Sequence, residues 1–104
     1  MSLERIIETL ESFGFERKEA EVYVYLGKKG PKEVKGLAEA LKIKKRQLKL
    51  ILKKLQSKGV VTASYERATV YSALDFEKTL DLLEKENIQK TKAIRKTLEK
   101  FKSN

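Results

Sequence analysis

The spacing of apolar residues changes at Gly59, and this change constrains the fold more than any other feature of the chain. Before Gly59, apolar residues recur every three or four positions, which is typical of helices that bury one face. After it, residues 60–65 and 69–74 are rich in β-branched and aromatic residues and flank residues 66–68, a pattern that predicts a β-hairpin. The chain is therefore expected to be mainly α-helical with one small hairpin.

Four helices are expected before the hairpin. The first is indicated by apolar residues at helical spacing, with Ser2 as its cap and Gly14 as its stop, namely Leu3, Ile6, Ile7, Leu10 and Phe13. The second ends at Gly30-Pro31, the strongest helix-breaking pair in the chain. A short extended piece separates it from a brief third helix and from a fourth whose inward stripe contains Leu48, Leu52 and Leu55. The expected ranges are about 17–28 for the second helix, 32–34 for the extended piece, 37–41 for the third helix and 44–57 for the fourth.

A final helix is expected from Asp75, its N-cap, to about residue 102. Its apolar and small residues are spaced like a coiled-coil seam that contains one stutter, with Thr91 near its middle. The spacing predicts dimerisation through Leu80, Leu83, Asn87, Ile94, Leu98 and Phe101. The alternative is that Phe76, Leu80 and Leu83 only pack on the domain and the rest of the helix frays. The expected division is a domain over 1–74 and a dimerisation helix over 75–104.

Composition excludes several classes of protein. A chain of 104 residues forms one small domain with a modest core. It contains no cysteine and no histidine, so it lacks a thiolate nucleophile, a zinc ribbon and the commonest acid/base group at neutral pH. An enzyme, a metal site and a cofactor are not expected. Neither a membrane span nor a signal peptide is found, which favours a cytoplasmic protein.

Seven of the nine net positive charges lie in residues 44–74. This stretch holds Glu66 as its only acid against eight basic residues, which are Lys44, Lys45, Arg46, Lys49, Lys53, Lys54, Lys58 and Arg67. Clustered cations repel one another unless a polyanion neutralises them. Nucleic acid is the first candidate partner.

Two helices joined by a tight turn and followed by a hairpin are the elements of a winged helix-turn-helix, in the order in which that motif has them. In this arrangement the second helix enters the major groove of double-stranded DNA and the hairpin reaches the flanking backbone. The expected DNA contacts are Lys44, Lys45, Arg46, Gln47, Lys49, Leu50, Lys53 and Arg67.

The side-chain types in this set suggest different roles. Lysines suit phosphates, Arg46 and Gln47 suit guanine and adenine, and Leu50 suits a thymine methyl group. The lysine excess predicts modest sequence preference. Arg67 at the hairpin tip is expected to contact phosphate or the minor groove, with an ion pair to Glu66 as its alternative.

Residues 19–23, with Leu26 and Gly30-Pro31 after them, resemble the start of the TrmB family of archaeal transcription regulators. The stretch 37–41, then Leu48, Leu52, Leu55 and residues 59–61, fits the same pattern. The resemblance covers residues 3–74 and implies a dimeric winged-helix DNA binder.

The chain departs from the family pattern in three places. Lys42 stands where a glycine often ends the first helix of the motif, and Lys44 where a small capping residue is usual. One helix follows the hairpin where longer members have a sugar-sensing domain, so a small-molecule effector is not predicted.

The leading hypothesis is a homodimeric transcription regulator that binds a pseudo-palindrome in double-stranded DNA. Two alternatives remain open: an architectural, chromatin-like DNA binder of low specificity, and a winged helix that binds an acidic protein.

Overall fold

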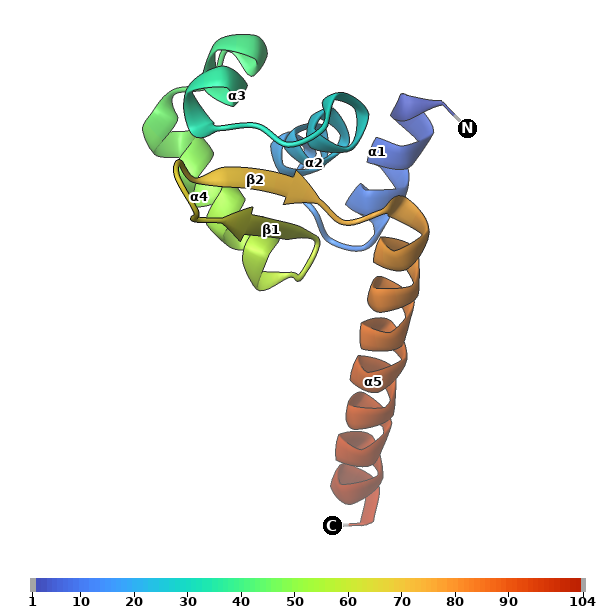
Figure 1. Ribbon diagram of the computed structural model, residues 1–104. Coiled ribbons are helices and arrows are strands. Elements are labelled where there is room, and N and C mark those ends of the chain that lie inside the picture. The colour runs from blue at the N-terminus through green and yellow to red at the C-terminus, as the bar shows by residue number, and fades with distance from the viewer. Residues whose placement is uncertain (1, 104) are drawn as a thin grey trace.

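The computed structural model describes residues 2–103, and its elements follow the expected order (Figure 1). The fold is mainly α-helical with one two-stranded antiparallel sheet, as predicted. The elements are α1 (Leu3–Ser12), α2 (Arg17–Lys29), α3 (Val34–Leu41), α4 (Lys45–Ser57), β1 (Val61–Ser64), β2 (Val70–Ala73) and α5 (Phe76–Ser103).

The helix ends lie where the sequence predicts them. The Ser2 hydroxyl oxygen accepts a hydrogen bond from the Arg5 backbone N–H at 3.2 Å, which caps α1. Gly14 and Gly30 follow α1 and α2 with φ angles of 95° and 87°, values that glycine adopts without steric cost. The extended piece that was expected at 32–34 is shorter, because Val34 already begins α3.

The hairpin is tied to the helical part by a third extended segment. Its strands are shorter than expected and pair from Val61 opposite Ala73 to Ser64 opposite Val70. Lys32 and Tyr71 exchange two backbone hydrogen bonds, at 3.0 and 2.8 Å, outside the named strands. The outer edge of β2 is therefore hydrogen-bonded to Lys32, close to the end of the hairpin that carries its tip, residues 65–69.

One hydrophobic core joins α1 to α4, the hairpin and the start of α5. Helix α4 contributes Leu48, Ile51, Leu52 and Leu55, which are all buried, so the predicted inward stripe is confirmed. Because these four residues fix one face of α4 against the core, the opposite face is turned to solvent.

Helix α5 begins on the domain and then leaves it. The buried Tyr23 hydroxyl donates to the Leu74 carbonyl and lies 2.9 Å from the hydroxyl of Thr79, which has no exposed surface. Burial raises the pKa of the Tyr23 hydroxyl. Beyond Leu83, which is 5% exposed, the helix projects away from the other elements (Figure 1), and the molecule measures 55 × 30 × 23 Å.

Candidate nucleic-acid interface

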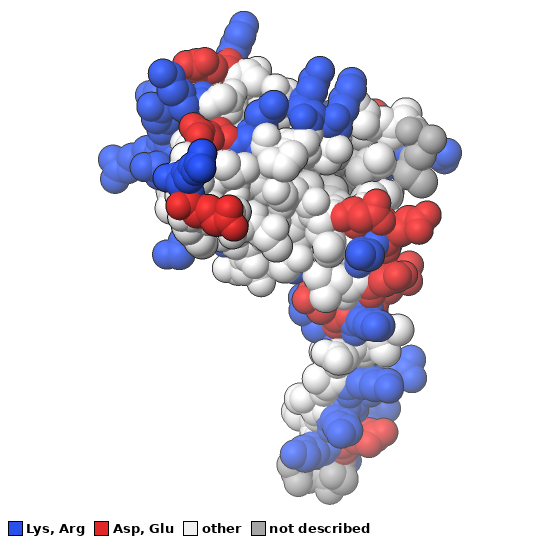
Figure 2. Space-filling model, viewed as in Figure 1, with Lys and Arg blue, Asp and Glu red and all other residues white. Residues whose placement is uncertain are grey.

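The outer face of α4 presents every predicted contact residue to solvent. The seven residues of this set at the start and along the outside of α4 are all exposed, namely Lys44, Lys45, Arg46, Gln47, Lys49, Leu50 and Lys53. Leu50 is 60% exposed, which is high for a leucine on a core helix. Figure 2 shows basic side chains gathered at the end of the globular part that carries α3 and α4. We call these seven residues, together with Arg67, the basic face.

Two lysines of the basic stretch turn away from this face. The Lys58 ammonium lies 3.1 Å from a carboxylate oxygen of Glu19 and 4.6 Å from the centre of the Phe15 ring. Lys54 lies 3.8 Å from a carboxylate oxygen of Glu16. Among the described residues, no ion pair involves a cation of the basic face. The structure thus separates two cations that pair with acidic side chains at the start of α2 from the cations of the basic face, which have no ion-pair partner among the described residues.

The start of α4 carries three cations where helices disfavour them. Lys44 is the N-cap residue and makes no side-chain capping hydrogen bond, and Lys45 and Arg46 follow in the first turn. The helix dipole disfavours each cation there by about 0.3 to 1 kcal/mol. A phosphate at this end would accept hydrogen bonds from the free backbone N–H groups and neutralise the side chains, which offsets this cost.

Lys42 adds a second local penalty beside the same end of α4. It closes α3 with φ 55° and ψ 42°, and it is the one non-glycine residue with positive φ among the described residues. The left-handed conformation costs a residue with a Cβ roughly 1 to 2 kcal/mol. The sequence expectation that a cation replaces the usual glycine at some conformational cost is therefore confirmed.

We expect Lys42→Gly to raise the free energy of unfolding by about 1 kcal/mol, because glycine removes the Cβ strain but loses more chain entropy on folding. This corresponds to a rise in melting temperature of about 5 °C for a chain of this size. Lys42→Ala is the matched control, since it removes the same charge and keeps the Cβ. Equal stabilisation by both variants in thermal and urea unfolding would show that charge, not backbone strain, limits stability here.

The hairpin tip offers one further cation. Arg67 is exposed, and no ion pair joins it to Glu66 in the part of the chain that the structure describes. Tyr65 is 71% exposed, whereas Tyr71 on β2 is half-buried. Tyr65 and Arg67 are therefore the hairpin side chains that can reach a ligand.

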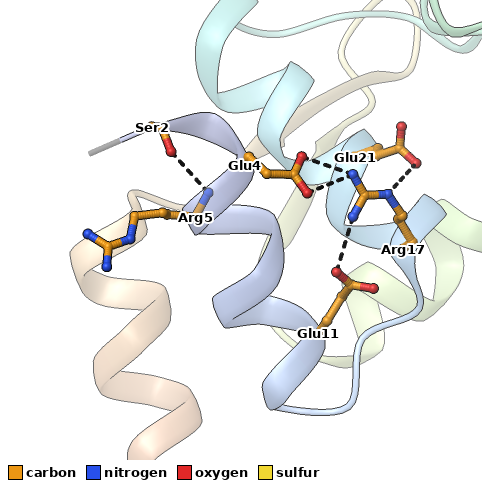
Figure 3. Close-up of polar contacts among 6 residues, drawn as sticks. All are labelled: Ser2, Glu4, Arg5, Glu11, Arg17 and Glu21. Carbon is orange, nitrogen blue, oxygen red and sulfur yellow. Dashed lines mark hydrogen bonds and ion pairs between the residues drawn. The ribbon is translucent and has the colours of Figure 1, made fainter.

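The acidic residues of α1 hold two helices together. Arg17 on α2 lies 2.9 Å from Glu4, 3.3 Å from Glu11 and 4.0 Å from Glu21, as Figure 3 shows. The hydrogen bond that Arg17 donates to the Glu4 carboxylate and the negative charge of that carboxylate raise the pKa of the Arg17 guanidinium. Glu4 and Glu11 form a surface ion-pair cluster and not a pair of catalytic acids.

No metal-binding group of acidic residues occurs among residues 2–103. No described helix is long and apolar enough to cross a membrane.

The predicted dimerisation residues fall into two groups on α5. Leu83 is buried in the core of its own domain, whereas Leu80 is half-buried. Asn87 is exposed, and Ile94, Leu98 and Phe101 are 67%, 48% and 79% exposed. The helix continues to Ser103 beyond the packed part. The sequence did not single out Ile88, which is also exposed on α5.

Helices α3 and α4 with the short turn between them, followed directly by the β1–β2 hairpin, form a winged helix-turn-helix, and solved structures of low sequence identity share this fold. Residues 10–77 match the family described as sugar-specific transcriptional regulator TrmB, and the chain belongs to this family. The resemblance seen in the sequence is thereby confirmed. No curated protein sequence matches the chain.

Solved structures share the fold at low sequence identity. The ST1889 protein from the thermoacidophilic archaeon Sulfolobus tokodaii aligns with a TM-score of 0.73 and 21% identity, over 90% of this chain and 99% of that chain. The transcriptional regulator Tm0710 from Thermotoga maritima has a TM-score of 0.63 and 19% identity, with 97% and 84% coverage. The YusO protein from Bacillus subtilis has a TM-score of 0.60 and 19% identity, with 94% and 84% coverage.

Proposed function

We propose that the chain is a homodimeric transcription regulator that binds double-stranded DNA, with α4 in the major groove and the β1–β2 wing on the flanking backbone. The observation that carries this proposal is the separation of the cations in residues 44–74. Lys54 and Lys58 pair with acids of α2, while the cations of the basic face have no ion-pair partner among the described residues. Unpaired cations on the element that this fold inserts into DNA match a phosphate ligand.

The side chains of the basic face favour backbone contacts over base contacts. Along α4 it holds four lysines, which act as point charges toward phosphate, and one arginine. Arg46 and Gln47 are the exposed residues suited to base edges, and Leu50 is suited to a thymine methyl group. We therefore expect a sequence preference that rests on few contacts.

Dimerisation is supported by the distal half of α5. Ile94, Leu98 and Phe101 lie at helical spacing on a part of the helix that contacts no other element, and all three are largely exposed. Large apolar side chains on an isolated helix favour association with a second helix. This exposed apolar surface supports a dimer that presents two copies of the basic face.

The test is fluorescence anisotropy against the chain's own upstream DNA and against a scrambled duplex of equal length, across a salt series. If a dimer neutralises about eight phosphates, log affinity falls against log salt with a slope of about −7. We expect the upstream duplex to bind at least about tenfold tighter than the scrambled one at the higher salt, since base contacts survive salt better than phosphate contacts.

The lysine-rich composition of the basic face favours a second candidate, an architectural DNA-binding protein of low specificity. It predicts equal affinity for both duplexes and loss of both at high salt. If neither duplex binds at low salt, DNA binding is excluded and an acidic protein becomes the partner that the basic face fits.

A further inference from the structure

The charge on α5 is divided between its two halves. Residues 75–88 contain five acidic and two basic residues, a net charge of −3, and residues 89–104 contain one acidic and six basic residues, a net charge of +5. Figure 2 shows acidic side chains where α5 leaves the domain and basic side chains toward its far end. The division is not a response to the helix dipole alone, because that effect is confined to the first and last turns.

Four of these charges lie in one line along the helix. Glu77 and Glu84 are seven residues apart, Arg95 follows after eleven, and Lys102 after seven more. Seven and eleven residues are close to two and three helical turns, so these side chains share one flank of α5. All four are exposed, and none has an ion-pair partner among the described residues. This acidic-to-basic flank borders the stripe of Leu80, Asn87, Thr91 and Leu98.

We infer that two copies of α5 pair antiparallel, with the acidic half of each helix beside the basic half of its partner. The inference rests on the homodimer proposed above and adds its orientation. Glu77 and Lys102 are equally distant from the Gln89–Lys90 peptide bond, and so are Glu84 and Arg95. A two-fold axis at this point places Glu77 beside the partner's Lys102 and Glu84 beside the partner's Arg95.

The apolar stripe is centred half a residue away, at Gln89. Leu80 and Leu98 are equally distant from Gln89, and so are Asn87 and Thr91. An antiparallel pair centred there sets leucine against leucine and places the two polar residues together at the middle of the seam. The two-fold axis of such a pair is perpendicular to the helices, so each charged flank lies against the same flank of the partner. Acidic residues of one helix then lie beside basic residues of the other.

A parallel pair gives none of these charged residues an oppositely charged neighbour on the partner helix. It sets the half with net charge −3 beside its own copy and the half with net charge +5 beside its own copy. Like charges across a helix pair repel and select against that orientation. The antiparallel pair also places the two DNA-binding domains at opposite ends of helices about 42 Å long, since α5 has 28 residues.

Spin labels on single cysteines decide the orientation, because the natural chain contains no cysteine. Lys78→Cys and Gln89→Cys both place the label on the exposed side of α5 opposite the stripe. In the antiparallel dimer, pulsed EPR should give the shorter distance at position 89 and a clearly longer one at position 78, where the two labels are offset by about 33 Å along the helix axis. Equal short distances at both positions show a parallel dimer. That result overturns the antiparallel orientation and leaves the homodimer intact. The absence of any dipolar coupling shows a monomer and overturns the homodimer itself.

Charge reversal supplies an independent test by analytical ultracentrifugation. Arg95→Glu should weaken the dimer about tenfold, because two symmetry-related pairs change from attraction to repulsion. The double variant Glu84→Arg/Arg95→Glu should restore the dissociation constant, and Lys96→Glu, on the opposite side of the helix, is the matched control. Failure of the double variant to restore the dimer overturns the pairing of Glu84 with the partner's Arg95.

Discussion

Replacing Lys45, Lys49 and Lys53 together by glutamine is expected to weaken DNA binding by at least about 100-fold near 0.1 M salt. The three residues are four positions apart, lie on the outer face of α4 and are exposed. A dimer loses six phosphate contacts through this change. The slope of log affinity against log salt should therefore become less steep by about 5, because each lost phosphate contact releases about one counterion fewer.

The matched control for this variant carries the same change in charge elsewhere. Lys78, Lys92 and Lys96 are exposed on α5, and their replacement by glutamine lowers net charge equally. We expect this control to change affinity by less than about threefold, since charges distant from the duplex are screened. Equal effects of the two triple variants would show that total charge and not the face of α4 determines binding.

Arg46→Ala separates base contacts from phosphate contacts on the same helix. If Arg46 binds guanine, the variant should bind the upstream duplex less tightly while its affinity for the scrambled duplex changes less. The difference in binding free energy between the two duplexes should then fall by roughly 1 to 3 kcal/mol. If the loss weakens both duplexes equally, Arg46 contacts phosphate only.

Glu19→Ala is expected to lower the free energy of unfolding by about 3 kcal/mol. The Glu19 side chain is 2% exposed, and its carboxylate accepts hydrogen bonds from the Lys58 ammonium at 3.1 and 3.2 Å and from the Glu16 backbone N–H at 2.8 Å. The truncation leaves a cavity, an uncapped backbone N–H and an unpaired cation. Lys58 is 31% exposed and can turn to water, which keeps the cost below that of a fully buried pair.

A double-mutant cycle in urea unfolding tests this assignment. Lys58→Met should cost at least as much as Glu19→Ala, because Glu19 has no route to water. The cycle consists of Glu19→Leu, Lys58→Met and the double variant Glu19→Leu/Lys58→Met. Both charges are absent in the double variant, so it should be more stable than Lys58→Met alone. Additive costs in the cycle would show that the two side chains do not act as a pair. DNA affinity of the folded variants should be unchanged, since this pair lies off the basic face.

Local sequence determined most of the fold. Helix bounds could be predicted because capping residues, the Gly30-Pro31 breaker and the 3.6-residue period act within a few positions of one another. The exposed residues of α4 were predictable for the same reason, since four apolar residues at helical spacing define which face is buried and hence which face is not. The strands were predicted one residue too long at each end because hairpin pairing depends on a partner strand and not on local preference alone.

Only the tertiary structure decided which charges and which apolar residues are available to a partner. The sequence places Lys54 and Lys58 in the same basic stretch as Lys53, but their partners Glu16 and Glu19 are nearly forty residues away, and no local pattern shows such a pair. Leu83 and Leu98 occupy similar positions in the stripe of α5, yet Leu83 is buried on its own domain and Leu98 is not. Periodicity tells which side of a helix is apolar, whereas packing between distant segments determines how much of that side is already covered.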